Sequence, residues 1–429
     1  MKSQIEKVLN DIGKMAKQLI SAQECKEILW KAVNIQANET DIQHELNVME
    51  NSFGYIADLA HLTIWMGKGN DEETREEFKF FVKLVPLDSN GKIRRSELTW
   101  MFEREAFMYA DMLLKFNATE ATHWHPKCYL ARKDLLVLEN LNLSGFKHLT
   151  HRTRFDCPLV ECVLRSVAAI HADSIAYEMK IHPRTIVDAF GEYREEFGIA
   201  PDKIWFQRGL EAIKAIIPMT KSYQRYPEKY RITTFDKLVF PIYEMVKPSS
   251  KYRNVFCHQD LWAGNIMFKF SQINGEDNLS EPSSCVLMDY QFPRYVPPIA
   301  DVLQLIFMTT RRSHRQRYLL SYCRVYYQCL HNELKRHGLN GETVLSWDDF
   351  RASYEDLKLM PMVSNCVALP FTYFPNEIQM KIKSSEAEEF RRVREENHHD
   401  YIIKYMEQDV EFKDVVLESI EELMETLYE

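Results

Sequence analysis

Residues 257–268, which read CHQDLWAGNIMF, are the stretch that decides the fold. They place Asp260 five residues before Asn265, in a predicted loop between two short apolar strands. The polar segment 271–284 separates the second strand from a third, and such segments are typical of hairpin loops. The third strand ends in a further carboxylate, Asp289. The sequence therefore predicts that these three polar side chains lie on one hairpin.

This spacing suits phosphoryl transfer from a metal–nucleotide complex. A hydroxyl nucleophile needs a carboxylate that orients it and accepts its proton, and Asp260 suits this role. The triphosphate needs Mg²⁺, which takes oxygen ligands such as an amide oxygen of Asn265 and a carboxylate of Asp289. The pattern H-x-D-x-x-x-x-N followed by a strand-end Asp is that of a kinase catalytic loop. We therefore expect ATP and Mg²⁺ as cofactors, with simple turn formation as the alternative role for these residues.

Such a site also requires a lysine on an N-terminal strand, held by a glutamate on a helix, to neutralise the nucleotide phosphates. Residues 78–85 read FKFFVKLV, a pattern typical of a strand, and contain Lys83. The following segment, 96–116, is predicted to be helical and offers Glu105 as the partner. Glu103 competes for this role, but helical spacing places the two glutamates on different faces.

Such a kinase also needs a hinge that presents backbone groups to adenine. We assign this hinge to Glu139, Asn140 and Leu141, which follow the apolar run DLLVL. These elements follow one another in the order that a two-lobed kinase needs. We expect an α+β, bilobal, protein-kinase-like fold. Its N-lobe, residues 1–138, would hold a small β-sheet and added helices; 139–141 would be the hinge; and 142–429 would be a large, mainly helical C-lobe with the catalytic hairpin.

Composition excludes several other classes of protein. Hydrophobic residues make up 45% of the 429-residue chain, which is enough for a packed core and rules out general disorder. The formal charge of −9 argues against a general nucleic-acid binder. The nine cysteines form no CxxC pair, and no apolar run approaches the ~20 residues needed to cross a bilayer. We expect a cytoplasmic protein with reduced thiols and no membrane or nucleic-acid partner.

Several motifs in the chain resemble the ecdysteroid kinase-like (CHK kinase-like) family, within the aminoglycoside phosphotransferase and choline kinase clan. The motifs are HQDLWAGNIMF (258–268), MDYQFPRYVPPIADVLQLI (288–306), VKLVP (82–86), FEREAFMYADML (102–113), LVLENLNLSGF (136–146) and the helix 167–172. The resemblance spans roughly residues 45–335. It implies an ATP-dependent kinase that phosphorylates a hydroxyl of an ecdysteroid or, in a detoxification role, of a xenobiotic alcohol.

The resemblance also implies roles for single residues. Asp260 would be the catalytic base, Asn265 and Asp289 the Mg²⁺ ligands, and Lys83 with Glu105 would act on the phosphates. Asp301 resembles the helix-start Asp that braces the catalytic loop. We expect His258 to be a scaffold for this loop rather than an acid or base, and His171 to pack beneath the loop.

Two departures from the family pattern concern the loops. The catalytic loop usually reads His-Gly-Asp in this family, but Gln259 stands at the middle position here. The phosphate-covering loop has one glycine, Gly54, instead of a series. These departures motivate a rival hypothesis, a catalytically weak pseudokinase that only binds nucleotide.

The acceptor is expected to be a small hydrophobic alcohol, bound in a pocket of the C-terminal half beside Trp262. The main alternative for the acceptor is choline or an aminoglycoside, which would make the protein a choline kinase or an aminoglycoside kinase. Choline kinases typically carry Glu after the metal-binding Asp–aromatic pair, but Gln291 follows Tyr290 here. A protein kinase is disfavoured because Asp-Tyr-Gln replaces the Asp-Phe-Gly motif and no Ala-Pro-Glu motif follows.

Two further clusters are predicted to have no catalytic role. His123 and His125 form a conceivable metal pair, but Cys and carboxylate partners are lacking nearby. The basic cluster 311–317 is predicted to be a solvated loop or helix end, with binding of an anionic substrate as the alternative.

Overall fold

The structure is a computed structural model. It describes residues 19–36, 38, 41–49, 57–67, 75–85, 97–116, 123–190, 198–375, 377–378, 396 and 398–429. The chain divides into two compact units, one comprising Met1–Lys115 and His125–Gly145, and the other Phe116–Trp124 and Phe146–Glu429. Gly54 and the predicted N-terminal helix before Leu19 lie outside the described residues.

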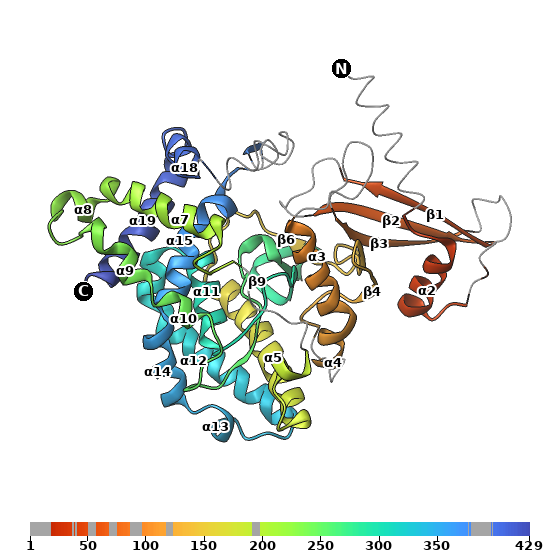
Figure 1. Ribbon diagram of the computed structural model, residues 1–429. Helices are drawn as coiled ribbons and strands as arrows, with labels where there is room; N and C mark the ends of the chain where they lie inside the picture. The colour runs from red at the N-terminus through yellow and green to blue at the C-terminus, as the bar shows by residue number, and fades with distance from the viewer. Residues whose placement is uncertain are drawn as a thin grey trace, which may run out of the picture. The chain divides into compact units, whose positions relative to one another are not determined.

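The first unit is built on an antiparallel five-stranded sheet with the order β1-β2-β3-β5-β4. Its strands are β1 (Ile42–Val48), β2 (Asp58–Met66), β3 (Glu76–Leu84), β4 (Cys128–Ala131) and β5 (Leu135–Leu138). Helix α2 (Ala22–Val33) starts with a capping box formed by Ser21 and Glu24. Alternate residues of the central strands, such as Leu62 and Val82, pack with Ile28 of α2 in one apolar core (Figure 1).

The helix that follows the sheet carries the predicted glutamate. It consists of α3 (Glu97–Phe107), a π-helical turn η3 (Met108–Met112) and α4 (Leu113–Phe116). Because side chains alternate along a strand, Lys83 of β3 points away from the face that Val82 and Leu84 present to α2. Lys83 can therefore reach α3 on the opposite face of the sheet.

The second unit is mainly helical and contains two small sheets. Strand β7 (Val255–Cys257) pairs with β10 (Arg294–Val296), and β6 (Lys147–His148) pairs with β8 (Ile266–Ile273), which pairs with β9 (Glu276–Leu287). The long helix α5 (Cys157–Ile181) is capped by Asp156. It packs along α12 (Arg312–Arg336) and against β7 and β9.

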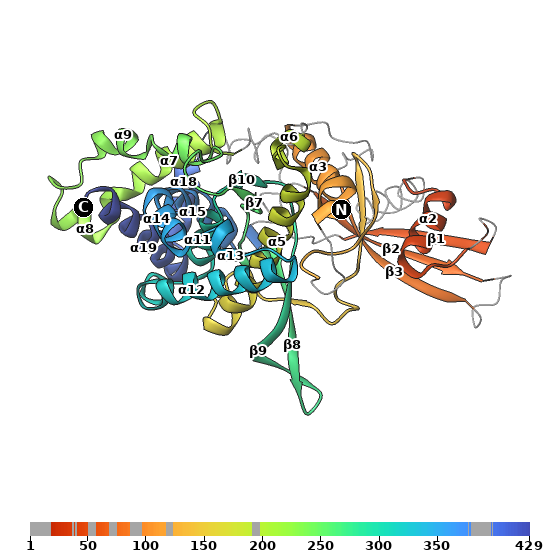
Figure 2. The same ribbon diagram turned by 90° about the horizontal axis from the view of Figure 1, so that it is seen from below.

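The hairpin β8–β9 is longer than the sequence predicted. Residues 271–284 were expected to form a loop, but both strands continue through most of this segment to a tight turn at Asn274 and Gly275. These two residues have φ angles of 54° and 83°, as a type I′ turn requires. Figure 2 shows this hairpin extending beyond the helices of the second unit. The outer part is mostly exposed, so it lacks the apolar alternation that identifies a strand.

After the catalytic hairpin, the part of the chain that the structure describes is mostly helical, as predicted. The helices are α11 (Ile299–Thr309), α12, α13 (Gly341–Val344), α14 (Trp347–Leu357), α15 (Leu359–Tyr373), α18 (His398–Met406) and α19 (Val410–Leu427). Between α5 and β7 lie α6 (Ile186–Ala189), α7 (Ile204–Ile216), η4 (Ile217–Met219), α8 (Lys221–Arg225), η5 (Ile232–Thr234), α9 (Phe235–Val239) and α10 (Ile242–Met245). Among the residues described, no helix combines the length and hydropathy needed to cross a bilayer.

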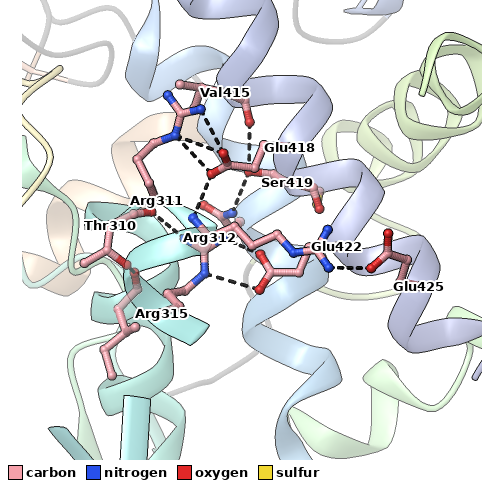
Figure 3. A network of polar contacts seen from close by, with 12 residues as sticks. Thr310, Arg311, Arg312, Arg315, Val415, Glu418, Ser419, Glu422 and Glu425 are labelled. Carbon is pink, nitrogen blue, oxygen red and sulfur yellow. Dashed lines mark hydrogen bonds and ion pairs between the residues drawn. The ribbon is translucent and has the colours of Figure 1, made fainter. Parts of the chain in front are cut away.

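The basic cluster 311–317 lies at the start of α12, and three of its arginines are paired with glutamates. Figure 3 shows its arginines paired with glutamates of α19: Arg311 with Glu418, Arg312 with Glu425 and Arg315 with Glu422. The side chain of Arg315 is only 3% exposed. The prediction of a solvated cluster was therefore wrong for these three arginines, because residues about a hundred positions away supply their counter-charges. Ser313, Gln316 and Arg317 of the same cluster are exposed, as predicted. The same pairing gives no support to the hypothesis of an anionic-substrate site.

Candidate active site

The predicted catalytic loop lies between β7 and β8 and includes the 3₁₀ turn η6 (Ala263–Asn265). The amide nitrogen Nδ2 of Asn265 donates to Oδ2 of Asp260 at 2.7 Å and to the backbone oxygen of Asp260 at 3.0 Å. The loop thus brings the predicted base and the predicted metal ligand into direct contact. Since the amide nitrogen is engaged with Asp260, the amide oxygen of Asn265 is the atom suited to a cation.

Asp289 follows the strand that pairs with this region. Ile266 at the start of β8 is opposite Leu287 at the end of β9, and the N–H of Met288 donates to the carbonyl of Asn265 at 2.9 Å. Asp289 is the next residue, so the hairpin places it at the same end as Asn265. Its φ angle of 67° lies in the left-handed region, which non-glycine residues rarely adopt and which is concentrated at functional sites.

His258 connects the loop to the strand that bears Asp289. Its Nδ1 accepts from the N–H of Asp260 at 3.2 Å, and its Nε2 lies 2.9 Å from the carbonyl of Met288. One acceptor and one donor define a neutral imidazole protonated at Nε2. Complete burial lowers the pKa of His258, which favours this neutral form. The geometry is that of a scaffold that ties Asp260 to the neighbouring strand.

Asp301, near the start of α11, accepts several hydrogen bonds from the loop. The N–H groups of His258 and Gln259 donate to its two carboxylate oxygens at 2.6 and 2.9 Å. His171 of α5 adds a contact of 3.2 Å from Nε2. Burial raises the pKa of Asp301, but the hydrogen bonds and the nearby imidazoles outweigh it and hold the pKa below its ordinary value. Asp301 is therefore an ionised anchor beneath the loop.

The structure accounts for glutamine in place of glycine at position 259. Gln259 has a φ angle of 60°, a left-handed conformation that glycine adopts without cost. Its side-chain amide donates to Oδ1 of Asp301 at 2.8 Å. This additional bond to a buried carboxylate offsets the conformational strain of a residue that has a Cβ. The departure from the family pattern is thus compatible with an intact loop.

Gly264 is required by the packing of Trp262. A Cβ atom at position 264 would lie 2.3 Å from the indole ring of Trp262 and would clash with it. The indole therefore lies over the glycine, within the same turn that carries Asn265. This packing fixes the position of the indole ring of Trp262, a residue that stands two positions after Asp260 in the chain.

In the first unit, Lys83 and Glu105 form a buried ion pair. Nζ of Lys83 lies 2.5 Å from Oε2 of Glu105, and the two side chains are 9% and 1% exposed. Glu103, the competing candidate, is exposed to solvent. The ammonium is thus held in one place on the sheet, as the nucleotide phosphates would require.

The predicted hinge forms a tight turn after β5. The N–H of Leu141 donates to the carbonyl of Glu139 at 3.1 Å, and the carbonyl of Asn140 accepts from Leu143 at 3.0 Å. The carboxylate of Glu139 accepts from the hydroxyl of Ser144 at 2.8 Å. The side chain of Glu139 and several backbone groups of the turn are therefore engaged in local hydrogen bonds.

The residues present fit a magnesium–nucleotide complex. Asn265 and Asp289 provide hard oxygen donors at one end of a hairpin, and oxygen donors are the ligands that Mg²⁺ prefers. Within the first unit, Lys83 provides a cation of the kind that suits phosphate oxygens. Asp260 is only partly buried, so a hydroxyl can approach its carboxylate.

A different cluster of possible metal ligands lies beneath the loop, but its atoms are already engaged. Atoms of His171, Cys257 and Asp301 lie within 4.8 Å of one another. However, Nδ1 of His171 contacts the hydroxyl of Tyr326 at 2.7 Å, its Nε2 contacts Asp301, and the thiol of Cys257 faces the carbonyl of Val296. We therefore interpret this cluster as a hydrogen-bond network. Neither His123 nor His125 belongs to it.

Sequence reasoning missed one residue of the loop's support. Gln304 of α11 lies one turn after Asp301 and hydrogen-bonds to the loop backbone through both atoms of its amide. Its spacing of three residues from Asp301 was the available signal, because residues three apart share a helix face. A neutral glutamine in an apolar helix gave no other indication.

A small antiparallel sheet with a buried lysine, together with a helical unit that carries an Asp–Asn hairpin, defines a protein-kinase-like fold. The chain belongs to the ecdysteroid kinase-like family, whose model matches residues 53–339. Family and fold together support a small-molecule, kinase-like phosphotransferase.

Solved structures with similarity to this chain are small-molecule kinases and phosphotransferases. An ethanolamine kinase of Plasmodium vivax aligns with 10% identity and a TM-score of 0.40, covering 84% of this chain and 85% of its own. A streptomycin–ATP complex of APH(2″)-IIa aligns with 14% identity and a TM-score of 0.35, covering 86% and 97%. The ADP-bound aminoglycoside phosphotransferase APH(2″)-Ib aligns with 13% identity and a TM-score of 0.31, covering 86% and 99%. A search of curated proteins found no match.

Proposed function

We propose that this protein transfers the γ-phosphoryl group of MgATP to a hydroxyl group of a small hydrophobic alcohol. The observation that carries the proposal is the 2.7 Å contact between Asn265 and Asp260, at the end of a hairpin that also bears Asp289. A base and two oxygen ligands in this arrangement suit phosphoryl transfer, which depends mainly on positioning and on stabilisation of charge.

Each residue has a defined part in this proposal. Asp260 orients the acceptor hydroxyl and accepts its proton as the hydroxyl oxygen bonds to the γ-phosphorus. The bond between that phosphorus and the bridging oxygen breaks, and ADP leaves. Asn265 and Asp289 hold Mg²⁺, which neutralises charge on the phosphate oxygens when bound. Lys83, fixed by Glu105, pairs with the phosphates. The backbone of Glu139, Asn140 and Leu141 receives the adenine, and Gly54 belongs to the loop proposed to cover the phosphates.

The acceptor class follows from family membership and from the surroundings of Asp260. The family is named for ecdysteroid kinases, so we propose an ecdysteroid or a xenobiotic alcohol of similar size, the latter in a detoxification role. Trp262, two residues after Asp260 in the chain, carries an indole with a large apolar surface. A cavity of about 450 Å³ also lies in the helical unit, but neither Asp260 nor Trp262 lines it. We therefore assign the acceptor to the surface next to Trp262.

The experiment that tests this function is incubation of the purified protein with Mg²⁺, ATP labelled in the γ-phosphate and a panel of alcohols. The panel should contain ecdysteroids, plant alcohols, choline, ethanolamine and an aminoglycoside. Label incorporated into a hydrophobic alcohol supports the proposal. Label incorporated only into choline, ethanolamine or the aminoglycoside supports the rival acceptor class. ATP binding without transfer to any compound of the panel or of a metabolite extract supports a pseudokinase.

A further inference from the structure

We propose that Gln304 is a positioning residue that fixes the orientation of Asp260. This inference rests on the proposed function, because it assigns Gln304 a part in presenting the base. Gln304 lies on α11, three residues after Asp301, on the helix face that meets the catalytic loop. Asp301 anchors the beginning of the loop, and Gln304 anchors the part that contains Asp260.

The amide of Gln304 bonds to the peptide groups on both sides of Asp260. Its Nε2 donates to the carbonyl of Gln259 at 2.7 Å. Its Oε1 accepts from the N–H of Leu261 at 3.0 Å. The first group belongs to the peptide bond that precedes Asp260, and the second to the peptide bond that follows it. One side chain therefore holds both peptide planes that flank the base.

Holding both planes fixes the two backbone dihedral angles of Asp260, because each peptide unit is planar and only φ and ψ rotate between them. The backbone groups of Asp260 itself are also engaged. Its N–H donates to His258, and its carbonyl accepts from Asn265. The direction of the Cα–Cβ bond, and hence of the carboxylate, follows from this backbone. A displacement of about 1 Å at a reacting group can lower a rate on the order of 100-fold.

The chemistry of the side chain explains why an amide suits position 304. The site needs one donor for a carbonyl and one acceptor for an N–H, and glutamine carries both on one planar group. Methionine has a similar length and volume but neither function. Gln304→Met therefore removes the two hydrogen bonds with little change in packing.

The test compares Gln304→Met with wild type in steady-state phosphoryl transfer and in MgADP binding by calorimetry. We expect kcat to fall by about 10- to 100-fold, with the KM for ATP and the affinity for MgADP within about twofold of wild type. The reason is that both hydrogen bonds of the Gln304 amide go to the segment around Asp260. Gln328→Met, at an exposed position of α12, is the matched control and should leave all three quantities unchanged.

A second comparison separates positioning from general stability. If Gln304 acts through Asp260, then Asp260→Asn and the double variant Asp260→Asn/Gln304→Met should show the same residual transfer. A merely structural role would lower transfer by the same factor in both backgrounds. Should Gln304→Met fail to fold, Gln304→Leu provides the same comparison.

An unchanged kcat in Gln304→Met, or equal losses of kcat and MgADP affinity, would overturn the assignment of Gln304 while leaving the proposed function intact. Absence of transfer by the wild-type protein would instead contradict the proposed function itself.

Discussion

The ion pair between Lys83 and Glu105 is the most deeply buried charge pair of the proposed site. Breaking such a pair leaves one charge without compensation in a poorly hydrated place, which costs about 3–5 kcal/mol. We expect Lys83→Met to lower the free energy of unfolding by this amount and to abolish phosphoryl transfer. Urea denaturation followed by circular dichroism measures the first effect.

The double variant Lys83→Met/Glu105→Leu separates stability from activity at this pair. Replacing both charges by apolar side chains of similar volume removes the uncompensated carboxylate, so we expect much of the lost stability to return. Transfer should remain absent, because no ammonium faces the phosphates. A double variant that is both stable and active would show that Lys83 has no part in catalysis.

Gln259 provides a second test at the scale of single residues, of how its side chain contributes to stability. Gln259→Ala keeps the left-handed conformation but removes the amide that bonds to Asp301, whereas Gln259→Gly removes the bond and the strain together. We expect the alanine variant to be less stable than the glycine variant by about 1 kcal/mol. Thermal unfolding of the two proteins measures the difference, and an equal melting temperature would contradict this account of the loop.

At this scale, the sequence predicted the residues that share a short motif. Asp260 and Asn265 are five positions apart, and their contact is confirmed by a hydrogen bond. Glu105 was preferred to Glu103 because the resemblance to the family aligns it and helical spacing puts the two on different faces, and it is Glu105 that pairs with Lys83. Gln304 was not predicted, because its function depends on which helix face meets the loop, and that is decided by tertiary packing. The roles of all these residues in catalysis stay predictions.

At the scale of elements, three ion pairs join α12 to α19 (Figure 3). The pair of Arg315 and Glu422 is the most buried, with side chains 3% and 15% exposed. We expect Glu422→Gln to lower the free energy of unfolding by about 3 kcal/mol, because it leaves a buried guanidinium without its counter-charge.

Glu425→Gln is the internal comparison for this prediction. The side chains of Arg312 and Glu425 are 25% and 32% exposed, so solvent screens their interaction. Its loss should cost no more than about 1 kcal/mol. Urea denaturation measures the decrease in the free energy of unfolding for each variant. Equal decreases would contradict the view that burial decides how much each ion pair contributes.

The contacts of Glu418 predict an acid-dependent loss of stability. Burial raises the pKa of Glu418, but bonds from Arg311 and from the N–H of Arg312 outweigh it and lower the pKa below its ordinary value of 4.5. A lowered pKa in the folded state means that the unfolded state binds the proton more readily. The contribution of Glu418 is therefore complete above about pH 4.5 and is lost as the pH falls through the folded-state pKa.

Melting temperatures of wild type and Glu418→Gln between neutral and acidic pH measure this effect. Wild type should be more stable than the variant at neutral pH, and the difference should shrink below about pH 4.5. A difference that stays constant over this range would mean that the charge of Glu418 contributes nothing.

Elements were predicted well where apolar periodicity was strong and poorly where it was weak. The helical segment expected over 96–116 is observed as α3, η3 and α4, which together run from Glu97 to Phe116. The outer part of β8–β9 was assigned to a loop because its polar residues alternate with other polar residues. The α12–α19 pairs could not be predicted, since about a hundred residues separate the partners in the chain.

At the scale of the whole molecule, the proposed function needs residues of each compact unit: Lys83 and Glu105 of the first, and Asp260, Asn265 and Asp289 of the second. Ligands that bind only the folded state stabilise a protein in proportion to the logarithm of their concentration. We therefore expect MgATP to raise the melting temperature of wild type, and the magnesium-dependent part of this rise to be absent in Asp289→Ala. An equal rise in the variant would mean that Asp289 does not contribute to metal binding.

The most direct test of the central claim is single-turnover transfer of labelled γ-phosphate to an alcohol acceptor, compared between wild type and Asp260→Asn. General-base catalysis contributes about 10²- to 10⁴-fold to such reactions. We expect the variant to bind MgATP as wild type does and to transfer the label slower by a factor in this range. Transfer by Asp260→Asn at the wild-type rate would contradict the assignment of Asp260 as the base.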